Sequence, residues 1–78
     1  MIAQDRLQRA FVAQLHRLSI TSPHSWRRAH PIGRDIGLVD AELEQAIQDA
    51  EKAGFIQRGV DDEGLILLTA KGRAAASQ

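Results

Sequence analysis

Residues 31–54 read PIGRDIGLVDAELEQAIQDAEKAG, and this stretch decides the fold. The opening proline suits the first position of a short helix, and Gly37 ends that helix because glycine accepts the left-handed backbone of a helix terminus. Asp40 is expected to cap the helix that follows. The apolar residues of that second helix recur at helical spacing and predict one buried face, made of Leu43, Ala46, Ile47, Ala50 and Ala53. The stretch therefore predicts a helix over 31–36, a tight turn, and a helix over 40–53.

The chain before this stretch predicts one long helix and then a segment with helix-start signals. One apolar stripe of a helix over residues 3–18 consists of Leu7, Phe11, Leu15 and Leu18, at spacings of four, four and three. Ser22 and Pro23 then place a capping residue before a proline that fits the first helical position. A short helical turn is accordingly expected over residues 25–28.

The chain after this stretch predicts a β-hairpin. Gly54 ends the helix, and residues 55–60 and 65–69 have the apolar content of two strands. The sequence between them, Asp-Asp-Glu-Gly, has hairpin length and ends in glycine. A helical stub over residues 70–76 closes the chain. The predicted class is α+β, mainly α with a small β-hairpin.

Three segments in this order resemble the winged helix-turn-helix superfamily, in particular the MarR-like bacterial transcription regulators. Residues 32–38 resemble its second helix and turn, residues 46–58 the end of its recognition helix and the first wing strand, and residues 65–73 the second wing strand and the helix after it. The resemblance implies one domain over residues 1–78, with a three-helix core, a helix-turn-helix at 31–53 and a wing at 55–69. It also implies a small DNA-binding protein, a transcription regulator, whose third helix enters the major groove.

The third predicted helix has an outward ridge that suits a DNA groove. At 100° per residue the ridge consists of Ala41, Gln45, Gln48 and Lys52, and glutamine can read the edge of adenine. Three arginines flank the second helix and form a candidate phosphate-contacting patch; the alternative is that they are solvated, with their stems over apolar neighbours. The candidate nucleic-acid-binding residues are Arg27, Arg28, Arg34, Gln45, Gln48 and Lys52.

Carboxylates flank this ridge and oppose the DNA hypothesis. Glu42 and Asp49 lie on one side of it, Glu44 and Glu51 on the other, and the wing tip carries Asp61, Asp62 and Glu63. Affinity for DNA comes largely from neutralising phosphates. Acids in the first turn, such as Asp40 and Glu42, also complement the helix dipole. The alternative interpretation of Asp49 and Glu51 is an ordinary solvated helix face. The alternative function is a protein-interaction module with little DNA affinity, whose candidate residues are Glu42, Glu44, Asp49, Glu51 and Trp26.

The distribution of charge also suits a docking module. Residues 1–39 hold six Lys/Arg and two Asp/Glu, a net charge of +4, whereas residues 40–78 hold four and eight, a net charge of −4. Such polarity favours a charged partner or head-to-tail self-association. Trp26 is a candidate stacking or anchoring residue, or else it packs a loop onto the first helix. DNA binding would call for a homodimer with its interface on the first helix or at Ala74–Ala76.

Several classes of function are not expected. The chain has no cysteine, so disulfides and thiol chemistry are excluded, and His16, His24 and His30 lack metal-ligand spacing. The serines, His24 and Asp35 form no nucleophile arrangement, so an enzyme is not expected, nor is a cofactor or a small-molecule site. No apolar stretch approaches the length of a membrane span, so we expect a cytoplasmic protein.

Overall fold

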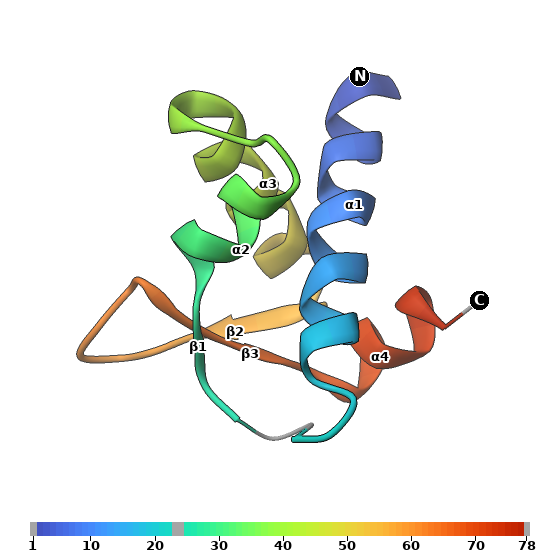
Figure 1. Cartoon of the computed structure of the whole chain (residues 1–78), viewed down its shortest axis with the longest axis vertical. Helices are drawn as coiled ribbons and strands as arrows, with labels where there is room; N and C mark the ends of the chain where they lie inside the picture. The colour runs from blue at the N-terminus through green and yellow to red at the C-terminus, as the bar shows by residue number, and fades with distance from the viewer. Residues whose placement is uncertain (1, 23–24, 78) are drawn as a thin grey trace.

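Four helices surround a small antiparallel sheet in the computed structural model, which describes residues 2–22 and 25–77 (Figure 1). In chain order the elements are α1 (Ile2–Leu18), β1 (Arg27–Arg28), α2 (Ala29–Asp35), α3 (Asp40–Lys52), β2 (Ile56–Arg58), β3 (Leu65–Leu68) and α4 (Ala70–Ala76). The α+β class predicted from the sequence is confirmed. None of the helices formed by these residues combines the length and apolar character that crossing a bilayer requires.

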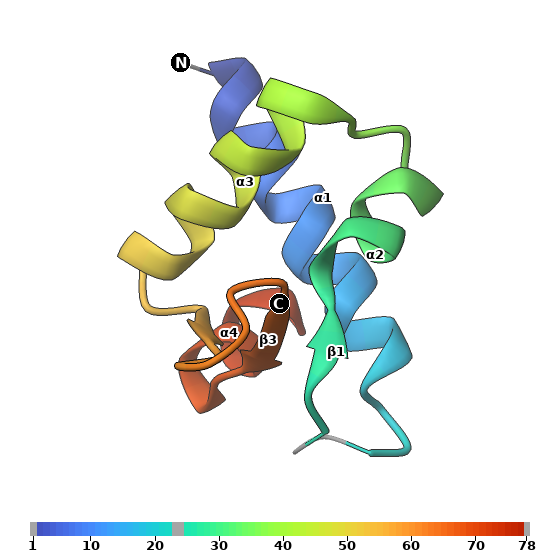
Figure 2. The same ribbon diagram turned by 90° about the vertical axis from the view of Figure 1, so that its left-hand side faces the viewer.

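The sheet contains a strand that the sequence did not predict. Its order is β1-β3-β2, and β1 pairs with β3 through Arg27 opposite Ile66 and Arg28 opposite Leu65. The expected helical turn over residues 25–28 is therefore wrong, because the ladder to β3 holds the backbone extended. Figure 2 shows β1 running directly into α2. The signal that misled the prediction includes Pro23, which lies outside the described residues.

The two central helices form as expected, but α2 starts earlier than predicted and α3, which starts at Asp40 as predicted, has a different cap. Helix α2 begins at Ala29, two residues before the predicted proline, because the amide of Ala29 donates to the carbonyl of Gly64 at 2.9 Å and fixes the end of β1. Gly37 has a φ of 83°, as a helix-ending glycine requires. The N-cap of α3 is Val39, whose carbonyl accepts the amide of Glu42 at 3.2 Å, and no side chain caps the helix. Asp40 is thus not the cap.

The hairpin is shorter than predicted: each strand loses one residue to a helix end, and β2 also ends at Arg58, two residues before the predicted end. Residue 55 stays outside β2, as the amide of Phe55 donates to the carbonyl of Ala50 and completes the end of α3. Thr69 stays outside β3 and caps α4: its Oγ1 accepts from the amide of Gly72 at 3.0 Å and donates to the carbonyl of Gly54 at 2.6 Å. One threonine therefore joins the ends of α3 and α4.

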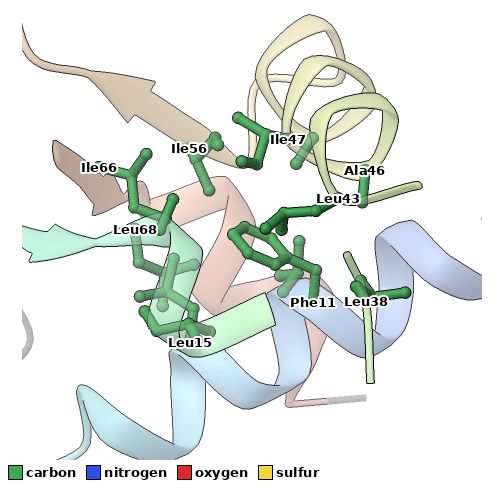
Figure 3. Close-up of a cluster of buried hydrophobic side chains, with 13 residues drawn as sticks. Phe11, Leu15, Leu38, Leu43, Ala46, Ile47, Ile56, Ile66 and Leu68 are labelled. Atoms are coloured by element: carbon green, nitrogen blue, oxygen red, sulfur yellow. The ribbon is translucent and has the colours of Figure 1, made fainter. Parts of the chain in front are cut away.

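The hydrophobic core lies between α1, α3 and the sheet (Figure 3). Phe11 and Leu15 of the predicted α1 stripe are fully buried, whereas Leu18 is 38% exposed. The predicted inner face of α3 is buried except for Ala53, which is half-buried. The buried apolar residues are Phe11, Val12, Leu15, Ala29, Ile32, Leu38, Leu43, Ala46, Ile47, Ala50, Ile56, Ile66 and Leu68. This packing turns the opposite face of α3 outward.

Candidate functional site

The outward ridge of α3 is only partly available for contacts. Gln45 is half-buried, and its Nε2 donates to Oδ1 of Asp49 at 2.9 Å, so one of its donors is already engaged. Gln48 and Lys52 are exposed, and neither forms a side-chain hydrogen bond or an ion pair within the described residues. Gln48 and Lys52 are thus the polar side chains of the predicted ridge that are free to contact a binding partner.

The three arginines of the predicted phosphate-contacting patch have different surroundings. Arg28 forms an ion pair with Asp62 of the β2–β3 loop, with Nη1 and Oδ2 3.3 Å apart. Arg27 is half-buried, and its Nε is a buried donor without a partner among the described residues. Arg34 is exposed at the end of α2 and has no ion pair within residues 2–22 and 25–77. A uniform basic patch is therefore not formed by these side chains.

Two carboxylates of α3 pair with basic side chains of neighbouring elements. Nε2 of His30 on α2 lies 3.2 Å from Oε2 of Glu44. Nε of Arg58 on β2 donates to Oε1 of Glu51 at 3.0 Å. Glu51 is exposed, as a solvated helix face implies, and it also pairs with Arg58. Asp49 is half-buried beside Gln45. These contacts attach α3 to α2 on one side and to β2 on the other.

Arg58 is a site residue that the sequence analysis missed. Its side chain is 16% exposed and lies between α3 and the hairpin, with Nη1 4.0 Å from Oε1 of Glu63 as well as the contact to Glu51. A signal for the Glu63 contact existed, because Arg58 lies on the predicted strand that leads into the hairpin loop and Glu63 lies in that loop, five positions later. Nothing local indicated Glu51, because that contact depends on how α3 packs against β2.

Replacing Arg58 with methionine is expected to lower the free energy of unfolding by about 1 kcal/mol, because the charge-assisted hydrogen bond to the partly exposed Glu51 is lost while the stem still packs. Glu63→Gln is the control, and it is expected to change stability by less than about 0.5 kcal/mol, because its contact is long and exposed. Urea denaturation followed by circular dichroism measures both. Equal losses for the two variants would contradict the central role of Arg58.

Even after these pairs form, the surface of α3 and the β2–β3 loop is strongly acidic. Residues 40–64 contain eight Asp/Glu against Lys52 and Arg58 alone, a net charge of −6. Six of these carboxylate residues are exposed, and Asp49 and Asp62 are half-buried. The eight carboxylates, here called the acidic surface, are Asp40, Glu42, Glu44, Asp49, Glu51, Asp61, Asp62 and Glu63. Such a surface attracts cations and repels phosphate.

Trp26 lines a groove of about 300 Å³ next to the C-terminal end of α1. It is 45% exposed and is not part of the core, and it lines the groove together with Leu18 of α1, so the expectation that it packs a loop onto the first helix stays a prediction. The ladder of β1 to β3 fixes the backbone next to Trp26 and leaves its side chain at the surface. The interpretation as a stacking or anchoring residue remains a prediction.

The described residues offer two charged or aromatic surfaces rather than a set of converging chemical groups. Within residues 2–22 and 25–77, no three His, Asp or Glu side chains gather as a metal site would require. The acidic surface and the groove at Trp26 adjoin through Arg28, which lines the groove and pairs with Asp62.

A scan against protein-family models, a search of the curated proteins and a search of the solved structures each found no match.

Proposed function

We propose that the chain is a winged helix-turn-helix domain with a binding function. Three features support this proposal: the order helix, strand, helix, helix, hairpin; the sheet order β1-β3-β2; and the four residues that separate α2 from α3. In this proposal α2 and α3 form the helix-turn-helix, and β2, β3 and their loop form the wing. Fold alone does not select the ligand, because one scaffold hosts unrelated functions.

The proposed ligand is a basic surface of a partner protein, bound by the acidic surface. The net charge of −6 over residues 40–64 carries this proposal. Exposed carboxylates on both flanks of α3 and on the wing steer a cationic partner toward that side and disfavour anionic ones. The contact of Glu44 with His30 and the ion pair of Glu51 with Arg58 connect α3 to its neighbouring elements and so preorganise the surface.

DNA-binding regulation is the second candidate, and one observation favours it. Arg34, Gln48 and Lys52 are exposed and have no ion pair within the described residues, so they remain available to phosphates and bases. Good DNA binders neutralise about six to ten phosphates. Here Arg28 is already paired with Asp62, and Arg58 with Glu51. Within residues 40–64 of the described structure, Lys52 is therefore the one cation left without an ion pair, against eight carboxylates. The protein partner is therefore the better-supported proposal.

Fluorescence anisotropy with two labelled probes tests the choice between these ligands. The probes are a peptide of about 12 alternating lysines and serines and a generic DNA duplex, titrated at about 20 to 200 mM salt, where screening changes most. We expect the peptide to bind at low salt and the duplex not to bind. Glu42→Gln combined with Asp61→Asn removes two exposed carboxylates that have no ion pair within the described residues, so peptide affinity is expected to fall about three- to tenfold.

The control adds the same positive charge away from the acidic surface. Ala10→Lys combined with Thr21→Lys changes two exposed positions and is expected to alter peptide affinity less than about twofold. An equal loss in both double variants would mean that only net charge matters and would contradict a specific acidic surface. Duplex binding that falls steeply with salt and is lost in Arg27→Glu combined with Arg28→Glu would favour the DNA regulator instead.

A further inference from the structure

The groove at Trp26 is lined by both apolar and charged side chains. It is lined by Leu18, Trp26, Arg27, Arg28, Pro31, Ile32 and Asp35. Leu18 is 38% exposed and Trp26 45%, and the neighbouring Ile20 is 66% exposed. Three large apolar side chains exposed so close together along the chain are typical of a docking surface rather than of scattered surface residues. A central tryptophan is also a common anchor of protein interfaces.

Arg27, which lines this groove, carries a donor that has no acceptor among the described residues. This donor is its buried Nε. A buried donor left unpaired is costly, and a carboxylate is the acceptor that suits a guanidinium best. The groove therefore fits a ligand segment that presents an apolar side chain beside a carboxylate.

The β2–β3 loop of the same chain presents that combination. Val60 is 97% exposed, the most exposed of the large apolar side chains described. Asp61 follows it directly, and both Asp61 and Glu63 are exposed. Within one molecule, Asp62 is paired with Arg28, which lines the groove. Because this pair fixes the loop, Val60 and Asp61 cannot enter the groove of their own chain. A tip on a second molecule has no such restriction.

We propose that the groove binds the β2–β3 loop of a second copy of this chain, with Val60 against Trp26 and Leu18 and with Asp61 near Arg27. The net charges of +4 over residues 1–39 and −4 over residues 40–78 make two copies complementary. Because the loop and the groove adjoin at Arg28, a two-fold arrangement brings both contacts into one interface. The inference rests on the proposed function, since the loop belongs to the acidic surface, and it names a second copy as the basic partner.

The size of the surface predicts a weak association. Stable interfaces bury about 800 Å² on each partner. That area is about a sixth of the 4977 Å² that this chain exposes, more than one loop tip and one groove provide. Two such contacts related by a two-fold axis together bury an area closer to about 800 Å² on each partner. The dimer is therefore expected to form at concentrations from about 10 μM to 1 mM and to weaken as salt screens the charges that line the groove.

Trp26 is the only tryptophan of the chain and reports on the contact directly. We expect its emission to shift to shorter wavelength as the wild-type chain is concentrated from about 5 μM to 1 mM at 20 mM salt, while sedimentation equilibrium shows the mass doubling. Val60→Ser changes a side chain that is 97% exposed, so it should leave the fold intact and weaken association about tenfold. Lys71→Ser, an exposed position on α4, is the matched control and should not weaken it.

A charge-swap experiment distinguishes self-recognition from non-specific attraction. Arg27→Glu places like charges in the contact, and so does Asp61→Lys combined with Glu63→Lys, so each variant alone should stay monomeric. Mixed together, the two variants form a pair in which every contact joins opposite charges, and association should return. Circular dichroism of each variant verifies its fold, and Val60→Ser remains the test if Arg27→Glu fails to fold.

Three outcomes would overturn the inference: a wild-type chain that stays monomeric at 1 mM, a mixture that does not associate, or a shift of Trp26 emission caused by a DNA duplex and not by a second copy. The basic peptide separates this failure from failure of the proposed function. If the peptide still binds the acidic surface of a monomeric chain, only self-recognition is refuted. If neither the peptide nor a second copy binds, the proposed function fails as well.

Discussion

Replacing Phe11 with alanine is expected to lower the free energy of unfolding by about 3–5 kcal/mol, because the ring is fully buried and its removal leaves a cavity. Phe11 lies among side chains of α3 and the sheet, so the cavity opens at the point where these elements meet (Figure 3). A chain of this length is stable by roughly 4–12 kcal/mol. The variant is therefore expected to be partly or wholly unfolded at 25 °C, as measured by circular dichroism in a urea titration.

Leu18→Ala is the matched control for Phe11→Ala, since Leu18 is on the same helix but 38% exposed. Its loss is expected to be about 1 kcal/mol, because less apolar area leaves contact and water fills the space. If both substitutions lowered stability by the same amount, Phe11 would not be at the centre of the core. The comparison measures how much of the stability depends on α1 packing against α3.

Gly72→Ala is expected to lower the free energy of unfolding by about 3 kcal/mol. A methyl group at this buried position would collide with the carbonyl oxygen of Phe55 and lie 2.7 Å from Cδ1 of Leu68. The Phe55 carbonyl cannot turn away, because it accepts the amide of Thr69 at 3.0 Å. Helix α4 would have to move off the sheet to make room. Thermal unfolding followed by circular dichroism measures the loss.

Gly37→Ala separates this collision from the effect of backbone conformation. Gly37 has a φ of 83°, but a methyl group there meets nothing within 4 Å, so only the left-handed conformation is penalised. That penalty is about 1–2 kcal/mol. A loss at Gly72 no larger than the loss at Gly37 would show that α4 yields easily and that its close approach to Phe55 is not required.

The charge pattern has a structural consequence whichever ligand is bound. Carboxylates that look like a uniform acidic helix in the sequence are divided by the fold into paired and unpaired groups. Glu44 and Glu51 hold α3 against α2 and β2, whereas Glu42 is exposed and has no ion pair within the described residues. Substituting all four flanking acids at once would therefore alter both binding and packing. This is why the proposed binding test uses pairs of substitutions and a charge-matched control.

Local signals in the sequence predicted most of the regular elements. The helical spacing of Leu43, Ile47 and Ala50 gave the buried face of α3, and the glycine after this helix, Gly54, has the expected positive φ of 83°. These features depend on the chemistry of adjacent turns, which a short window of sequence contains. The candidate site was predicted to the extent that it depends on composition: the excess of carboxylates on α3 and on the loop follows from residue identity alone.

The sequence by itself determined the α+β class, the inner face of α3, the hairpin and the separation of charge between the two halves of the chain. Only the tertiary structure decided that Arg27 and Arg28 form a strand, because two arginines have no apolar alternation and become extended by pairing with β3. It also decided which polar side chains have a partner. The side chain of Arg28 contacts Asp62, 34 positions away in the sequence, and that of His30 contacts Glu44, 14 positions away. Hydrogen bonds and ion pairs between distant segments depend on how helices pack, and no local pattern of residues encodes that distance.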